Sequence, residues 1–133
     1  MSSRAEMLAL AERFFLAIET GDLATVRSLY AAETRIWHND DRIEQSREEH
    51  LASLAAFVGG SHSRVYEIIR RECIHGGFMQ QHVLRVESHA GETFELPACV
   101  ICLVEDERII RLDHYFDSVQ AGALLEGLTR GLS

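Results

Sequence analysis

The sequence predicts an α+β domain in which three N-terminal helices pack on a strongly curved, mainly antiparallel sheet, followed by a short C-terminal helix. Two observations lead to this expectation. Apolar residues recur at helical spacing in roughly the first 60 residues, and long β-type runs separated by turn signals follow from residue 64 onward. A chain of 133 residues with 47% hydrophobic and 26% charged residues suits one globular domain, residues 1–133.

The first half of the chain predicts the three helices. Apolar spacing indicates a helix over residues 6–19, after a capping box that begins at Ser3. Gly21 ends this helix and Asp22 caps a second, short one. A third helix over residues 45–58 is stopped by two glycines. The residues expected to face inward are Met7, Ala11, Phe14, Phe15, Ile18, Leu23, Val26, Leu29, Tyr30, Leu51, Leu54, Ala55 and Val58.

The strands are predicted from β-type composition and from the turns between them. A short strand covers residues 35–38. Three long runs follow at residues 64–74, 78–87 and 93–105, and the stretch 107–118 completes an antiparallel meander. A closing helix is expected over residues 119–128.

The last strand carries a histidine in an apolar row. Because side chains alternate along a strand, Ile110, Leu112, His114 and Phe116 share one face, and Arg111, Asp113, Tyr115 and Asp117 share the other. The first face is the one expected to point into the core or a pocket. With the opposite register, Arg111, Asp113 and Tyr115 would line the pocket instead.

Charge, hydropathy and cysteine content indicate which binding partners, location and thiol chemistry to expect. The formal net charge of −8 disfavours nucleic acid and anionic membranes, because both would be repelled. No apolar run approaches the roughly 20 residues of a membrane helix and the N-terminus lacks the pattern of a signal peptide, so a cytoplasmic location is expected. Cys99 and Cys102 fall on opposite faces of a strand and are expected to be structural thiols.

Four stretches are typical of one known fold family: ETGDL at 19–23, LYAAE at 29–33, IWHN at 36–39 and RIIRLDHYFD at 108–117. Together they resemble the nuclear transport factor 2-like superfamily, in its SnoaL-like and ketosteroid isomerase-like branch. The resemblance implies a cone-shaped α+β barrel, also called cystatin-like, with a small-molecule pocket between helices and sheet. It also implies a homodimer formed through the open sheet face. The superfamily includes isomerases, dehydratases, epoxide hydrolases, polyketide cyclases and non-catalytic binders.

The catalytic motifs of two enzyme families with this fold can be aligned with this sequence residue by residue. The ketosteroid isomerase pattern places His38 at the carboxylate base and Phe14 at a hydrogen-bonding tyrosine. The limonene epoxide hydrolase pattern places Trp37 and Asn39 at its water-positioning pair and His114 at a catalytic aspartate. This sequence therefore contains the complete catalytic motif of neither family.

The expected site centres on three histidines, because an imidazole titrates near neutrality and can take or return a proton. The candidate proton-transfer residues are His38, His82 and His114, with Asn39 and Gln80 to hold a substrate oxygen and Phe14, Trp37 and Phe116 as walls. No cofactor and no metal are expected. The remaining histidines, His50, His62, His75 and His89, are expected to be solvated.

Two functions stay open from the sequence. The first is a cofactor-independent isomerase or lyase, ketosteroid isomerase-like or polyketide cyclase-like, acting on a small apolar carbonyl compound with a histidine base. The second is a non-catalytic ligand-binding or dimerisation module of the same fold.

Overall fold

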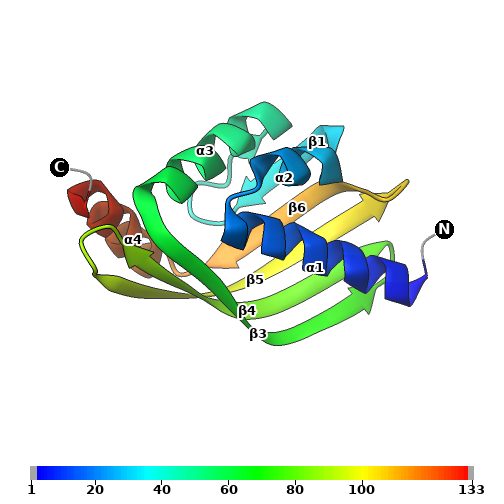
Figure 1. The fold of residues 1–133 in the computed structure, drawn as a ribbon. Helices are drawn as coiled ribbons and strands as arrows, with labels where there is room; N and C mark the ends of the chain where they lie inside the picture. The colour runs from blue at the N-terminus through cyan, green and yellow to red at the C-terminus, as the bar shows by residue number, and fades with distance from the viewer. Residues whose placement is uncertain (1–2, 132–133) are drawn as a thin grey trace.

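The computed structural model describes residues 3–131, which form helices packed on one face of a single sheet (Figure 1). Within these residues the elements are α1 (Arg4–Thr20), α2 (Leu23–Leu29), β1 (Tyr30–His38), β2 (Glu44–Gln45), α3 (Arg47–Gly60), β3 (Ser61–Ile74), β4 (Gly77–Ser88), β5 (Thr93–Glu105), β6 (Arg108–Phe116) and α4 (Ser118–Gly131).

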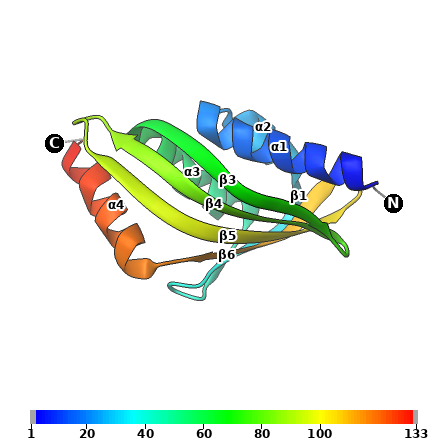
Figure 2. The same cartoon turned by 90° about the horizontal axis from the view of Figure 1, so that it is seen from below.

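The sheet has six strands in the order β2-β1-β6-β5-β4-β3. All neighbours are antiparallel except β1 and β6, which run parallel and place His38 directly beside His114. The sheet is open and curved (Figures 1 and 2). The α+β class predicted from the sequence is thereby confirmed.

The hydrophobic core lies on the concave face of the sheet in two parts. The larger part packs α1 and α2 against the sheet around Phe14, Tyr30 and Phe78. The smaller part packs Leu124 and Leu128 of α4 on the far ends of β4 and β5. Helix α4 therefore closes one end of the cone, as Figure 2 shows.

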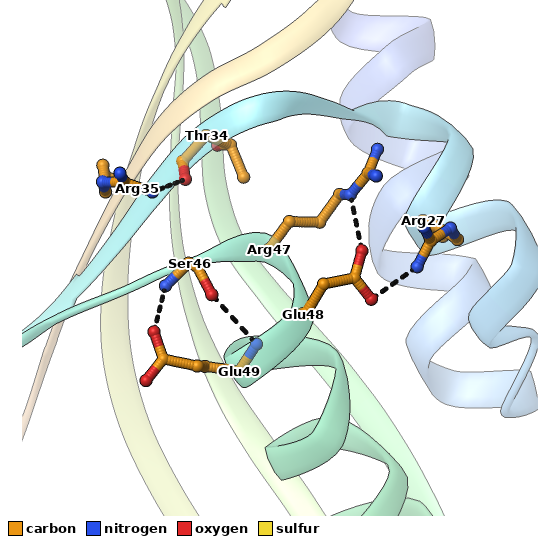
Figure 3. A network of polar contacts seen from close by, with 7 residues as sticks. All are labelled: Arg27, Thr34, Arg35, Ser46, Arg47, Glu48 and Glu49. Carbon is orange, nitrogen blue, oxygen red and sulfur yellow. Dashed lines mark hydrogen bonds and ion pairs between the residues drawn. The ribbon is translucent and has the colours of Figure 1, made fainter.

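The helices begin and end where local chemistry predicts. Ser3 and Ser46 each complete a capping box, at the start of α1 and of α3. Gly21 ends α1 in the left-handed conformation, with φ of 74°. Figure 3 shows the start of α3, where Glu48 bridges Arg47 and Arg27 and so ties α3 to α2.

Several boundaries differ from the sequence prediction. Tyr30 was expected inside the second helix but takes an extended conformation and begins β1, five residues before the predicted strand. The two glycines expected to stop the third helix lie in its last turn, and β3 begins directly after them at Ser61. The short strand β2 was not predicted. In each case the strand pairing of the folded protein outweighs the secondary-structure propensity of the local sequence.

A β-bulge divides the alternation of β6 into two registers. Leu103 of β5 pairs with Arg111 and Val104 pairs with Ile109, which leaves Ile110 as the extra residue. Leu112 and His114 point inward as predicted, whereas Ile109 replaces Ile110 as the fully buried residue. The expectation that Ile110 belongs to the inward row is therefore wrong.

The cysteines follow the alternation of β5. Cys102 is completely buried in the core, while Cys99 is half-buried on the opposite face, and both are free thiols. Between residues 3 and 131, no helix is both long and apolar enough to cross a membrane.

Candidate functional site

A small cavity lies between helices α1 and α3 and the concave face of the sheet. Its volume is about 60 Å³, which is about the volume of two water molecules in the liquid. Phe14 and Phe15 of α1 and Leu112 of β6 are among its apolar walls, and three histidines, His50, His82 and His114, also line it. No carboxylate is among the lining side chains.

Three imidazole rings lie in contact at one side of this cavity. The ring centre of His38 lies 5.4 Å from that of His114 and 5.6 Å from that of His50. The parallel register of β1 and β6 brings the first pair together, and α3 supplies the third ring. Phe116 covers the cluster, 4.7 Å from His114 and 6.1 Å from His38. We call His38, His50 and His114 the histidine cluster.

Burial keeps the histidine cluster uncharged. It lowers the pKa of His114 to about 3, with further lowering by the neighbouring imidazoles of His38, His82 and His50. It likewise lowers the pKa of His50 to about 3, with His38 as the second cause. Burial also lowers the pKa of His38, but Asp40 and Asp41 act in the opposite direction. At neutral pH the rings of His50 and His114 are uncharged, and each presents one unprotonated nitrogen as a hydrogen-bond acceptor, although burial makes both rings weaker bases than an exposed imidazole.

His82 lies on β4 with a separate set of partners. It is 2% exposed, and its ring packs edge-on against Tyr66 at 4.7 Å and Phe15 at 5.6 Å. Burial lowers its pKa to about 4, helped by the charge of Arg71. The site therefore combines the histidine cluster with a fourth neutral histidine.

Two polar residues predicted to hold a substrate oxygen have other partners. The Asn39 side-chain NH₂ donates to the Phe116 carbonyl, and its Oδ1 accepts from the Phe116 N–H, each over 3.0 Å. This amide therefore joins the end of β1 to β6. The Gln80 amide accepts from Arg71 and contacts His82, so it supports the histidine rather than facing the cavity.

Trp37 lies on the opposite face of the sheet from the cavity. It follows the buried Ile36 and precedes His38, so the alternation of β1 directs it outward, where it packs 5.3 Å from Tyr115. The expectation that it forms a pocket wall therefore differs from the structure. Phe14 does line the cavity, and Phe116 contacts two rings of the histidine cluster.

His50 is the residue that the sequence prediction missed. It was expected in solvent, yet it is 7% exposed and lines the cavity. Its position four residues before Leu54 was the available signal, because residues at that spacing share one face of a helix. Nearby, the Tyr30 and Thr34 hydroxyls are buried and have no hydrogen-bond partner, and the Tyr30 ring lies 5.7 Å from that of His50.

Among the described residues, no group of three or more His, Cys, Asp and Glu side chains is arranged to hold a metal ion.

A larger groove of about 600 Å³ lies elsewhere, between α2, the start of β1 and the β5–β6 turn. It is open and lined by charged side chains of both signs, including Arg27, Arg47 and Glu33 (Figure 3 shows the two arginines). Because it contains none of the histidines, the chemistry described above belongs to the smaller cavity.

Comparison with solved structures identifies relatives that share the fold over nearly the whole chain. PrhC from Penicillium brasilianum NBRC 6234 is 17% identical over 98% of this chain and 96% of its own, with a TM-score of 0.83. An LEH-like epoxide hydrolase from M. tuberculosis is 19% identical over 97% of this chain and 93% of its own, with a TM-score of 0.74. IdmH from Streptomyces antibioticus, a candidate polyketide cyclase, is 19% identical over 89% of this chain and 96% of its own, with a TM-score of 0.76.

These likenesses establish the nuclear transport factor 2-like fold, which hosts several activities. A search of curated proteins gives no match. The family model of the SnoaL-like domain matches residues 11–112, which include most of the cavity lining. The chain therefore belongs to the SnoaL-like domain family.

Proposed function

We propose that this protein binds a small, mostly apolar carbonyl compound in the cavity, which must widen to admit it, because 60 Å³ is less than the volume of a cyclic ketone. It catalyses proton transfer on this compound, as an isomerase or lyase of the ketosteroid isomerase-like or polyketide cyclase-like type. A histidine of the cluster acts as the base, with His38 and His114 as the first candidates. The observation that carries the proposal is the contact of neutral imidazoles with an otherwise apolar cavity.

The groups around His114 and His38 give the two rings different affinities for a proton, which supports different roles for them. His114 lines the cavity and has access to a ligand, but three neighbouring imidazoles disfavour its protonated form. His38 does not line the cavity, yet Asp40 and Asp41 favour its protonated form. A proton taken by His114 is therefore more stable on His38, whose ring centre is 5.4 Å away.

Deuterium exchange tests the proposed catalysis. Cyclopentanone and cyclohexanone incubated with the protein in D₂O should exchange their hydrogens next to the carbonyl faster than in buffer. His114→Ala and His38→Ala should each slow exchange at least tenfold, while His75→Ala, at an exposed turn, should leave it unchanged. Equal rates in all four proteins and in buffer would refute a catalytic role for the cluster.

The second candidate is a non-catalytic binding protein of the same fold. It is favoured by the lack of any carboxylate in the cavity lining and by Phe14, which cannot donate a hydrogen bond at the position of the isomerase tyrosine. Under this alternative, ring resonances of His114 and His50 shift in NMR spectra on adding a ketone, and no exchange occurs.

We also propose that the protein forms a homodimer through the outer face of the sheet. This face is not covered by a helix, and it carries Val65, Leu103 and Tyr115, which are between 37% and 52% exposed. Exposed apolar side chains on one continuous face favour burial against a second copy.

A further inference from the structure

We infer that Gln45 and Gln80 hold two cavity histidines in opposite neutral tautomers, so that the cavity offers a ligand one proton acceptor, Nε2 of His50, and one proton donor, the Nε2–H of His82. The inference rests on the proposed function for the chemistry that it assigns to the two rings, and within the histidine cluster it names His50, in place of His38 or His114, as the group that takes the proton. The hydrogen bonds that fix the rings do not depend on it.

The tautomer of His82 follows from a chain of two hydrogen bonds. Arg71 donates from Nε to Gln80 Oε1 over 2.7 Å. A guanidinium has no acceptor, so the amide oxygen must face Arg71 and the amide NH₂ must face His82. Gln80 Nε2 lies 2.9 Å from His82 Nδ1. That ring nitrogen therefore accepts, and the single proton of the neutral ring is on Nε2.

His50 is fixed by a different chain with the opposite result. Ser53 donates its only hydroxyl proton to the Glu49 carbonyl over 3.3 Å, so its oxygen accepts from Gln45 Nε2 over 3.3 Å. This leaves Gln45 Oε1 facing His50 Nδ1 at 3.3 Å. Because an amide oxygen can only accept, His50 carries its proton on Nδ1 and keeps a free lone pair on Nε2.

Both rings border the cavity in which a ligand would lie. His50 and His82 both line the cavity, and both lower the pKa of His114, which places all three rings in one site. Across residues 3–131, Tyr30 Oη and Thr34 Oγ1 are the buried side-chain N and O atoms that lack a hydrogen-bond partner. Neither Nε2 atom is sealed off in this way, which fits an orientation toward the cavity.

The two tautomers select a ligand with complementary groups. A ketone with a hydrogen on the carbon next to its carbonyl presents an acceptor oxygen to His82 and a removable proton to His50. In the reaction, His50 Nε2 takes the proton and becomes imidazolium. The electrons of the broken C–H bond form a C=C bond, and those of the C=O π bond move to oxygen, where the His82 Nε2–H stabilises the charge. Return of the proton to carbon restores the neutral His50.

Nitrogen NMR of the full-length protein tests the assignment without any ligand. In ¹⁵N-labelled protein at pH 7, protonated and bare ring nitrogens have well separated shifts. His82 should show a protonated Nε2, and His50 should show a protonated Nδ1. Finding the same tautomer in both rings would overturn the inference.

Two matched substitutions sharpen the test. Gln80→Glu replaces the donor facing His82 with an acceptor and should invert that tautomer. Gln45→Glu keeps an acceptor opposite His50 and should leave that tautomer unchanged. Gln81→Glu makes the same charge change at the next residue of β4, on the outer face, and should alter neither ring. An unchanged His82 in folded Gln80→Glu protein would contradict the assignment; if that variant does not fold, the wild-type spectrum and Gln45→Glu decide.

The outcomes separate this inference from the proposed function. Opposite tautomers without deuterium exchange into cyclohexanone would refute the catalytic proposal and keep the assignment of the protons. Exchange in the wild type that persists unchanged in Gln80→Glu, with His82 inverted, would refute the donor role of His82 and leave a histidine base in place. At least a tenfold loss in Gln80→Glu, with Gln81→Glu unaffected, is the result expected.

Discussion

Individual histidines in this protein differ because their neighbours differ. His62, His75 and His89 are exposed at strand ends and turns, whereas His50, His82 and His114 are enclosed by apolar and aromatic groups. Desolvation disfavours the charged imidazolium, so burial is the first cause of each lowered pKa. His50, His82 and His114 therefore remain neutral in the pH range in which an unperturbed imidazole takes up a proton.

This difference predicts that the free energy of unfolding falls as the pH falls from 7 to 5. In that window the unfolded chain protonates its histidines near pH 6.5, while His50, His82 and His114 in the folded protein stay neutral, because burial lowers their pKa to about 3, 4 and 3. The unfolded state therefore binds more protons. Each buried histidine contributes a slope approaching about 1.4 kcal/mol per pH unit.

Urea denaturation at pH 7, 6 and 5 measures this slope. Carboxylates titrate mainly below the window, which isolates the histidines. His114→Gln should reduce the pH dependence by about one proton, and His75→Gln should not. Stability that is constant between pH 7 and 5 would contradict the burial of neutral imidazoles.

The elements position the site through pairings between distant parts of the chain. The parallel register of β1 and β6 sets His38 beside His114, and the Asn39 amide locks that register by exchanging two hydrogen bonds with Phe116. Helix α1 is held over the sheet by Arg64, which donates to the carbonyls of Ile18 and Glu19. These contacts leave little freedom in the relative placement of the rings.

The bulge in β6 predicts unequal effects of substitution at two adjacent isoleucines. Ile109→Ala removes a completely buried side chain from the core and should reduce the free energy of unfolding by about 2–5 kcal/mol. Ile110 is half-buried and lines the larger groove between α2, β1 and the β5–β6 turn. Ile110→Ala should therefore reduce the free energy of unfolding by less than half as much. Chemical denaturation of both variants measures the difference. Equal losses would argue against the bulge at this point.

The whole molecule has one face covered by helices and one face bare. Salt bridges flank the bare face, with Arg85 between Glu67 and Glu95 on one side and Arg111 between Glu44 and Asp113 on the other. Apolar residues of β4 and β5, including Met79, Val83 and Ile101, lie between them. Gln81 lies among these residues, so the centre of the face is mainly apolar and its rim is charged, a composition found in specific protein interfaces.

Ile101→Arg tests the proposed dimer at the centre of this face. If the wild-type protein sediments as a dimer, the substitution should shift it to a monomer, because a long charged side chain would have to be accommodated in the contact. Val119→Arg introduces the same charge at an exposed apolar residue on α4, outside the face, and should leave the dimer intact. A wild-type monomer in analytical ultracentrifugation at micromolar concentrations would refute the proposal.

Local patterns in the sequence determined much of the architecture. Capping boxes at Ser3 and Ser46 and apolar spacing located α1 and α3, and turn signals separated the four long strands. The alternation of β6 predicted that His114 shares a face with Leu112, because side-chain direction along a regular strand depends only on parity, and the structure shows that this is the inner face. These features arise within a few residues of one another and so can be read before the chain is folded.

Only the tertiary structure decided which polar groups meet. The bulge that exchanges Ile109 for Ile110 depends on pairing with β5, and the burial of His50 depends on how α3 rotates against β1. Likewise, Asn39 and Gln80 were predicted to face a substrate, but in the structure they form hydrogen bonds with Phe116 and Arg71. A hydrogen bond forms with whichever partner the fold brings within reach, and that partner can lie as many as 77 residues away in sequence, as it does for Asn39 and Phe116.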